Sequence, residues 1–389
     1  MIRVLVSENQ PGDTERLLQG LAESRDLQVV GLTRDGLETA QMIARLHPDV
    51  ALVRAQMPGM DGFQTCRMAL LVSPETACLL VFDTAAAAEG LREEAMRSGA
   101  RGLTDLTADA AQLAGVIAEL VKLQQHQEGD DFRLVTDPAR MPVTISVTGA
   151  KGGVGKTTVA TNLAVTLQQR YPNEVVLVDF VGQYSDVNLL LDLPTNGSLV
   201  DLAEYEELDA EVLNPRLSRH GSGLRILAGA SGPQSMEAAS SISLPLVANL
   251  MGALRRDFRF VVLDMPALLP PLSRYIFLRS SAIVVVTCLR ELSSMRNTGA
   301  LLASLLTGQV PPERIQLVVN RRQASDPFGV ADLRQATQHP VALELPQAPE
   351  ALAALNSGVP FVLSKPMAPV SRGIGRLADL LVSAGPTTG

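Results

Sequence analysis

The 389-residue sequence has no Trp, only four Tyr and nine Phe, and only three Cys. So few aromatic rings leave little material for the stacking platforms that bind single-stranded nucleic acid. Cys66, Cys78 and Cys288 lie far apart and form no C-x-x-C pair, which excludes a disulfide framework and argues against a zinc or iron–sulfur site. Hydrophobic residues still make up 46% of the chain, which is enough to build two full cores.

A surplus of basic residues and a long apolar run are also missing. The chain carries 33 Lys+Arg against 41 Asp+Glu, a net charge of -8, which is the wrong sign for a general nucleic-acid coat or a polybasic membrane anchor. No apolar run approaches the ~20 residues of a membrane span. Residues 1–7 are typical of a strand and not of a signal peptide. We therefore expect a cytoplasmic protein with no membrane insertion and no specific nucleic-acid partner.

Short apolar runs alternate with helical patterns over residues 1–123. Strands are predicted at residues 3–6, 27–32, 50–53, 78–82 and around 103. Helices are predicted at residues 14–22, 37–46, 63–72, 91–98 and 108–123. Strands that alternate with helices of this length imply a parallel sheet with right-handed crossovers. The first domain is therefore predicted to be α/β and flavodoxin-like, with a five-stranded parallel sheet.

The composition changes over residues 124–142 (QQHQEGDDFRLVTDPARMP), which are polar, acidic and closed by two prolines. This stretch is predicted to be an interdomain linker. A second domain is predicted over residues 143–389, with apolar runs at residues 143–148, 175–178, 224–227, 260–263, 283–286 and 315–319. Because these runs do not alternate with polar residues, they indicate a mostly parallel sheet that helices flank on both faces.

The most specific pattern is Gly149-Ala-Lys-Gly-Gly-Val-Gly-Lys-Thr-Thr158, which follows a predicted strand and precedes a predicted helix. Consecutive glycines let backbone N–H groups converge on phosphate oxygens, and the helix N-terminus adds partial positive charge. In such a loop the lysine reaches the terminal phosphates and the following hydroxyl binds Mg²⁺. The pattern predicts a nucleotide site formed by Gly152, Gly153, Val154, Gly155, Lys156, Thr157 and Thr158.

A second lysine, Lys151, precedes the glycine pair, and the resulting K-G-G-x-G-K-T pattern resembles the deviant Walker A motif of the ParA/MinD family of P-loop ATPases. Ala150 stands where the motif usually has its first glycine. The resemblance continues to about Leu381 and implies ATP and Mg²⁺ as ligands. It also implies catalytic roles for Lys156 and for Lys151, which would cross a dimer interface to the partner's nucleotide.

The same resemblance assigns residues beyond the loop. The run VVLVD, which ends at Asp179, resembles the switch I strand, and FVVLDMP, which contains Asp264, resembles the Walker B strand. By this resemblance Asp179, Asp264 and Thr157 are expected near the magnesium ion. The alternative for the two aspartates is that they only cap a turn at the end of a strand. The run LVVNR resembles the adenine segment, so Asn320, Arg321 and Pro346 are the expected adenine contacts.

One acid of the family pattern is absent. Most relatives carry a second acid two residues after the switch I aspartate, whereas Val181 stands there in this chain. Valine can neither accept a proton nor align a water molecule, and positioning of water is a large part of phosphoryl transfer. We therefore expect tight binding of Mg-ATP with slow or negligible hydrolysis. Asp186 can replace the missing acid only if the loop that carries it folds back. Whether the protein acts as an ATPase enzyme of this type is left open.

The run from His47 to Gly62 (HPDVALVRAQMPGMDG) resembles the third strand and following loop of response-regulator receiver domains. The position of the phospho-accepting aspartate holds Arg54, which puts a cation where magnesium would sit. Ser7 and Glu8 follow the first strand, so the expected pair of acids is reduced to one carboxylate. The resemblance therefore implies a receiver-like domain that cannot be phosphorylated.

Further receiver positions support this expectation. The lysine expected after the fifth strand is replaced by Asp105 or Leu106, and only Thr84 keeps the pattern. A fold that is kept without its chemistry is usually kept for its surfaces. Residues 91–123 are therefore the candidate dimerisation surface, with a solvated helix pair as the alternative.

A degenerate receiver followed by a ParA/MinD-like ATPase resembles the TadZ/CpaE proteins of type IVb (Flp/Tad) pilus assembly. The resemblance implies a localisation factor that forms homodimers through ATP and through the receiver-like domain. It also implies recruitment of pilus assembly and secretion proteins to a polar focus. The alternative is a ParA/MinD-type ATPase that positions the division site, flagella or DNA. The DNA-positioning form is less favoured because residues 255–256 and 321–322 are the only obvious arginine pairs and the overall charge is negative. The division-site or flagellar form is less favoured because residues 374–381 are typical of a domain helix and not of an amphipathic membrane helix.

Overall fold

A computed structural model describes residues 1–73, 75–133, 141–180, 186–194, 197–205, 208–229, 242, 244–266 and 272–383. Val181, on which the expectation of slow hydrolysis depends, lies outside the described residues. The chain divides into two units, one from residues 1–134 and the other from most of residues 135–389. Each unit is described by itself.

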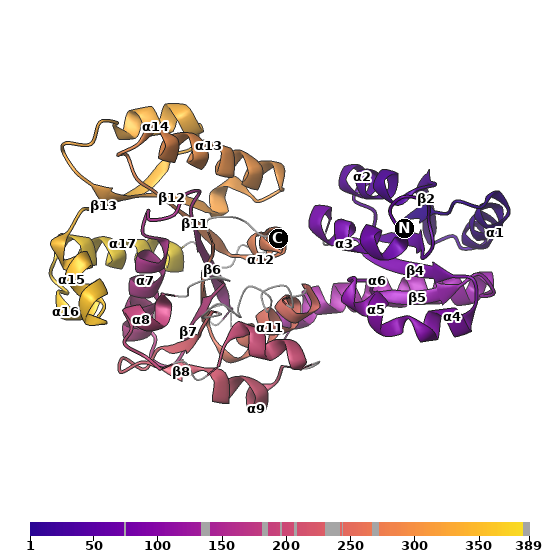
Figure 1. Ribbon diagram of the computed structural model, residues 1–389, viewed down its shortest axis with the longest axis horizontal. Coiled ribbons are helices and arrows are strands. Elements are labelled where there is room, and N and C mark those ends of the chain that lie inside the picture. Colours follow the sequence, from indigo (N-terminus) through magenta and orange to yellow (C-terminus); the bar gives the residue numbers. More distant parts are fainter. Residues whose placement is uncertain are drawn as a thin grey trace. The chain divides into compact units, whose positions relative to one another are not determined.

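The first unit is a parallel sheet with helices on both faces. Its five strands are β1 (Ile2–Ser7), β2 (Leu27–Thr33), β3 (Val50–Arg54), β4 (Ala77–Phe82) and β5 (Gly102–Asp105). They pair in the order β2-β1-β3-β4-β5, and every pairing is parallel. The helices are α1 (Pro11–Ala22), α2 (Gly36–Leu46), α3 (Gly62–Val72), α4 (Ala85–Gly90), α5 (Arg92–Arg97) and α6 (Ala110–Arg133) (Figure 1). The predicted five-stranded, receiver-like α/β domain is confirmed.

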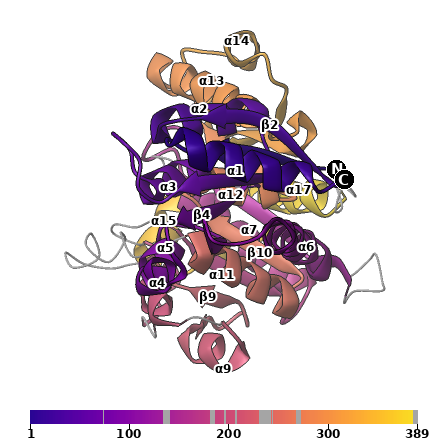
Figure 2. The same cartoon turned by 90° about the vertical axis from the view of Figure 1, so that its right-hand side faces the viewer.

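Strand β3 shows how this unit builds two cores. Val50 and Leu52 join a cluster with residues of α1 and α6, whereas Ala51 and Val53 join a cluster with residues of α2, α3 and α5. Successive side chains of a strand point to opposite faces, so an uninterrupted apolar run is buried on both sides. Figure 2 shows α3 and α5 on one side of the sheet and α6 on the other.

Two helices of this unit differ from the expectation. Helix α4 begins directly after Thr84, whose hydroxyl accepts the N–H of Ala87, in a stretch where no helix was expected. Its four consecutive alanines have the highest helix propensity. Helix α6 runs to Arg133 and so enters the stretch predicted to be linker. The polar residues there include good helix formers and no proline before residue 138, so polarity alone misplaced the end of the helix.

The second unit contains an eight-stranded sheet. Its strands are β6 (Val143–Thr148), β7 (Val175–Asp179), β8 (Ser218–Arg219), β9 (Arg225–Leu227), β10 (Phe260–Asp264), β11 (Ala282–Thr287), β12 (Ile315–Arg322) and β13 (Val341–Pro346). They pair in the order β13-β12-β11-β6-β10-β7-β9-β8, and only the pairing of β8 with β9 is antiparallel. This confirms the mostly parallel sheet that the apolar runs predicted.

In the described residues of this unit the α-helices are α7 (Lys156–Arg170), α8 (Val187–Leu190), α9 (Ala210–Leu213), α11 (Leu244–Asp257), α12 (Ser273–Arg279), α13 (Leu292–Thr307), α14 (Val330–Thr337), α15 (Pro349–Ser357), α16 (Phe361–Ser364) and α17 (Pro369–Ser383). None of the helices in the described part of the chain is long and apolar enough to cross a membrane.

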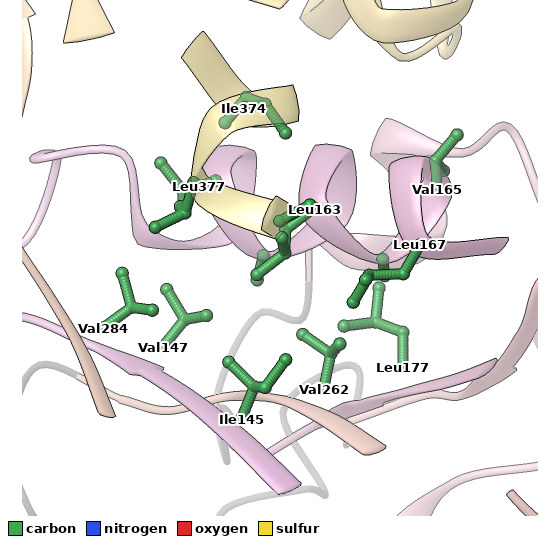
Figure 3. Packing of buried hydrophobic residues seen from close by; sticks show 14 of the residues in the cluster. Ile145, Val147, Leu163, Val165, Leu167, Leu177, Val262, Val284, Ile374 and Leu377 are labelled. Carbon is green, nitrogen blue, oxygen red and sulfur yellow. The ribbon is translucent and has the colours of Figure 1, made fainter. Parts of the chain in front are cut away.

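Helix α7 lies at the centre of the core of the second unit. Leu163 and Leu167 point towards the strands, where Ile145 and Val262 are fully buried, and α17 packs against α7 with Leu377 (Figure 3). Burying a side chain of this size contributes about 1.5–3 kcal/mol. Packing on both sides therefore fixes α7, and with it the glycine-rich loop that ends where α7 begins.

Candidate nucleotide-binding site

The glycine-rich loop connects the end of β6 to the first turn of α7. Gly153 and Gly155 have φ values of +78° and +95°, a left-handed conformation that glycine adopts without strain. A Cβ atom on Gly155 would lie 2.4 Å from the Asn320 side-chain nitrogen, so this position also lacks room for a side chain. Helix α7 begins directly at Lys156 with no side-chain cap. Its first N–H groups are therefore available to an anion such as a phosphate.

The Lys156 side chain lies beneath this loop and is largely buried. Its Nζ atom donates one long hydrogen bond, 3.4 Å, to the carbonyl oxygen of Lys151. Burial lowers the pKa of Lys156, and the charge of Asp264 partly opposes this effect. An ammonium group has three N–H donors, so Lys156 keeps donor capacity for a phosphate.

The Lys151 side chain contacts the start of α13. Its Nζ atom forms an ion pair with Glu291 and a 3.3 Å hydrogen bond to Ser293 Oγ. The pair lowers the pKa of Glu291. No local pattern connects these two positions, which lie 140 residues apart in the chain. Within one chain, the Lys151 ammonium group is therefore held at the surface beside α13.

Two buried carboxylates lie side by side at the carboxyl ends of neighbouring strands. Asp179 ends β7 and Asp264 ends β10, the two residues are partners in the parallel register, and both are fully buried. Neither carboxylate oxygen of Asp264 has a hydrogen-bond partner of ordinary geometry among the described residues. Burial and then the charge of Asp179 raise the pKa of Asp264 to about 8, although the Thr157 hydroxyl and Lys156 lower it.

This arrangement fits a magnesium ion held with a nucleotide. Hydroxyl and carboxylate oxygens are the ligands that Mg²⁺ prefers, and Mg²⁺ in phosphate sites is held by one or two protein groups plus phosphate and water. Thr157, Asp179 and Asp264 provide such oxygens next to the phosphate-binding loop. Two neighbouring buried carboxylates repel each other, so a divalent cation would stabilise them.

The pKa of Asp264 leads to a prediction about stability. Its folded-state pKa of about 8 lies above the ordinary value of 3.8, so between these pH values the folded protein binds one more proton than the unfolded chain. The stability of the nucleotide-free protein should therefore fall as pH rises, by up to about 1.4 kcal/mol per pH unit. Asp264→Asn should remove this loss. Thermal unfolding of both proteins in EDTA at about pH 6 and about pH 9 tests this, and equal pH dependence would contradict it.

A cavity of about 210 Å³ opens next to the start of α7. Thr158 of the loop lines it, together with the three expected adenine contacts Asn320, Arg321 and Pro346. The Asn320 amide is fixed in orientation, because Nδ2 donates to the Val154 carbonyl and Oδ1 accepts the Arg321 N–H, both at 2.9 Å. Further lining residues that sequence reasoning missed include Arg290, Gln347, Ala351, Leu352, Phe361 and Ile374.

The site residues predicted from sequence therefore lie in one region of the second unit. Lys156, Thr157, Asp179 and Asp264 lie close together at the glycine-rich loop, and Thr158, the next residue, lines the cavity. Lys151 is the exception, because its side chain is directed to Glu291.

Two known families match this chain. Residues 145–361 match the CobQ/CobB/MinD/ParA nucleotide binding domain, and residues 4–117 match the response regulator receiver domain. The first match spans more than half of the chain. The protein therefore belongs to the CobQ/CobB/MinD/ParA family of nucleotide-binding domains and carries a receiver domain in front of it.

Individual relatives agree with this assignment. The chain is 29% identical over 160 residues to the septum site-determining protein MinD of Helicobacter pylori, covering 41% of this chain and 57% of that protein. It is also 29% identical over 245 residues to a protein-glutamate methylesterase/protein-glutamine glutaminase of Myxococcus xanthus, covering 58% of this chain and 68% of that protein. The solved cell division ATPase MinD of Pyrococcus furiosus superimposes with a TM-score of 0.54 at 25% identity, over 62% of this chain and 99% of that structure.

Proposed function

We propose that this protein binds Mg-ATP and acts as an ATP-dependent dimerising localisation factor. The observation that carries the proposal is the juxtaposition of Lys156, Thr157 and the buried Asp179 and Asp264 carboxylates beside a cavity lined by the expected adenine contacts. A Pyrococcus horikoshii MinD of the same fold is described as a complex with Mg-ADP, which supports a magnesium nucleotide as the ligand.

Each part of the site has a distinct role in this proposal. The N–H groups of the glycine-rich loop and of the first turn of α7 bind phosphate oxygens, and Lys156 contacts the terminal phosphates. Thr157, Asp179 and Asp264 hold Mg²⁺, which neutralises phosphate charge. Asn320, Arg321 and Pro346 hold the adenine. Hydrolysis is slow, because Val181 supplies no group that orients water.

Dimerisation makes ATP a switch in this proposal. Lys151 leaves Glu291 and contacts the nucleotide of a second copy, so bound ATP favours the dimer by mass action. The receiver-like domain adds a second dimer contact, for which residues 91–123 are the candidate surface. Lys151 and Glu291 are both partly exposed, so an exchange of partners costs little.

The combination of a receiver with a MinD/ParA-type domain supports the TadZ/CpaE class of pilus localisation factors, working with type IVb (Flp/Tad) pilus assembly and secretion proteins. The second candidate is a ParA/MinD-type ATPase that positions the division site, flagella or DNA. The similarity to the H. pylori septum site-determining protein favours that second candidate.

The location of a fluorescent fusion in its own cells separates these candidates. We expect one or two discrete foci at a pole that coincide with pili, and we expect Lys156→Ala to disperse them because ATP no longer holds the dimer together. A Lys365→Ala variant, which alters an exposed lysine of the same unit, is the matched control and should keep the foci. A coat over the nucleoid or the whole membrane would contradict the pilus assignment and support the second candidate.

A further inference from the structure

Arg290 lies between the end of β11 and the start of α13, and it lines the cavity that contains the expected adenine contacts. Strands β11 and β12 pair side by side with Thr287 opposite Val319, so the segment that carries Arg290 begins beside the segment that carries Asn320. Parallel strands bring their carboxyl ends to the same edge of a sheet, where ligands of α/β domains bind. The fold therefore adds a guanidinium group to the wall of this cavity.

A buried carboxylate from the loop after β12 faces Arg290. Asp326 Oδ1 lies 3.9 Å from Arg290 Nε, and only 2% of the Asp326 side chain is exposed. Its Oδ2 atom accepts hydrogen bonds of 2.9 Å from Arg322 Nη1 and from the Gln323 N–H. Burial alone would raise the pKa of Asp326, but these hydrogen bonds and the charges of both arginines lower it. Asp326 is therefore a fixed negative charge on the Nε side of the Arg290 guanidinium group.

The Nη atoms of Arg290 keep their N–H groups for a ligand. Arg322 also forms an ion pair with Glu344 at 3.3 Å, whereas Asp326 is the only acid in ion-pair contact with Arg290 among the described residues. In the same part of the chain, no acid lines the cavity and apolar side chains form much of its wall. A planar guanidinium group beside an apolar wall suits an aromatic base, because it stacks on the ring or donates to ring nitrogens.

We propose that Arg290 binds the purine base of the nucleotide and that Asp326 is the residue that positions Arg290. This inference rests on the proposed function, because it assigns one end of the same Mg-ATP site. Asp326 holds the Nε side of the guanidinium group, and the Nη groups contact the base. Lys156 and the glycine-rich loop bind the phosphates. Loss of Arg290 should therefore affect the base end of the ligand alone.

Calorimetric titration with Mg-ATP and, separately, with inorganic triphosphate in the presence of Mg²⁺ tests the role of Arg290, because triphosphate has no base. Arg290→Met, which keeps an apolar stem, should raise the Kd for Mg-ATP about tenfold or more. It should change the Kd for triphosphate by no more than about twofold. Lys156→Ala should weaken the binding of both ligands. Arg296→Met, at an exposed arginine of α13, is the matched control and should bind both like the native protein.

A double-mutant cycle tests whether Asp326 acts through Arg290. Asp326→Asn should raise the Kd for Mg-ATP about threefold in the native background. It should have no effect on this Kd in Arg290→Met, because a positioning residue acts only through the group that it holds. Asp326→Ser serves as a second variant if Asp326→Asn folds poorly.

The two titrations separate failure of this inference from failure of the proposed function. Native affinity for Mg-ATP in Arg290→Met, or equal losses for the two ligands, would overturn the contact with the base. An equal effect of Asp326→Asn with and without Arg290, or failure of both Asp326 variants to fold, would overturn the positioning role. A native protein that binds neither ligand would contradict the proposed function itself.

Discussion

Replacing Lys156 by alanine is expected to weaken Mg-ATP binding by about a hundredfold or more and to leave the nucleotide-free protein as stable as before. A hydrogen bond to a charged group contributes about 1.5–3 kcal/mol, and a lysine ammonium group has enough N–H donors for two bonds to phosphate. Their loss corresponds to a Kd that rises by about two orders of magnitude or more. Removal of Lys156 also takes away a cation that faces the phosphates across a buried site, where charges interact more strongly than in water.

The unchanged stability follows from the surroundings of Lys156. Burial lowers the pKa of this lysine and the charge of Asp264 opposes this effect only in part, so the folded protein disfavours the lysine charge when no phosphate is present. The single 3.4 Å hydrogen bond to the Lys151 carbonyl compensates little. Lys156→Met keeps the volume of the stem and should show the same loss of affinity, which separates the charge from the packing.

Calorimetric titration with Mg-ATP and thermal unfolding without nucleotide measure the two halves of this prediction. Lys365→Met, at an exposed lysine of the same unit, should bind like the native protein. Native affinity in Lys156→Ala would contradict the assignment of the phosphate site. A parallel fall in the unfolding temperature of Lys156→Met would instead indicate that this side chain supports the fold.

The sheets could be predicted because their information is local. An apolar run such as residues 260–263 is buried whichever strands flank it, so it can be predicted to be a strand before the order of the strands is known. The order of the eight strands, and the short antiparallel pair of β8 with β9, depend on contacts between distant segments. The end of α6 was misplaced for a different reason, because helix propensity outweighed the polarity that suggested a linker.

In the candidate site, too, features set by local sequence could be predicted, and contacts between distant segments could not. The loop from Gly152 to Thr158 is contiguous, and its chemistry follows from the order of its residues. The partner of Lys151 is 140 residues away, and nothing in the run around Glu291 distinguishes that acid from an ordinary surface residue. Similarly, the position of Arg54 revealed that the receiver site was altered, but only the fold brings Asp13 and Asp83 to its guanidinium group.

Lys151→Ala should separate ATP binding from dimerisation. Within one chain the ammonium group contacts Glu291 and Ser293, so its loss should change Mg-ATP affinity by no more than about fivefold. A symmetric dimer would contain the Lys151 contact twice. Two charge-assisted bonds of about 1.5–3 kcal/mol each correspond to a dimer Kd at least about a hundredfold higher.

Sedimentation velocity with Mg-ATP measures this dimer directly. Arg170→Ala is the matched control, because it breaks a partly exposed ion pair with Asp379 in the same unit and should leave the dimer intact. If Lys151→Ala dimerises as well as the native protein, Lys151 does not act across the interface. Its role is then limited to the ion pair with Glu291 within one chain. If it loses ATP binding as well, Lys151 serves its own nucleotide, and the dimer must be held by other residues.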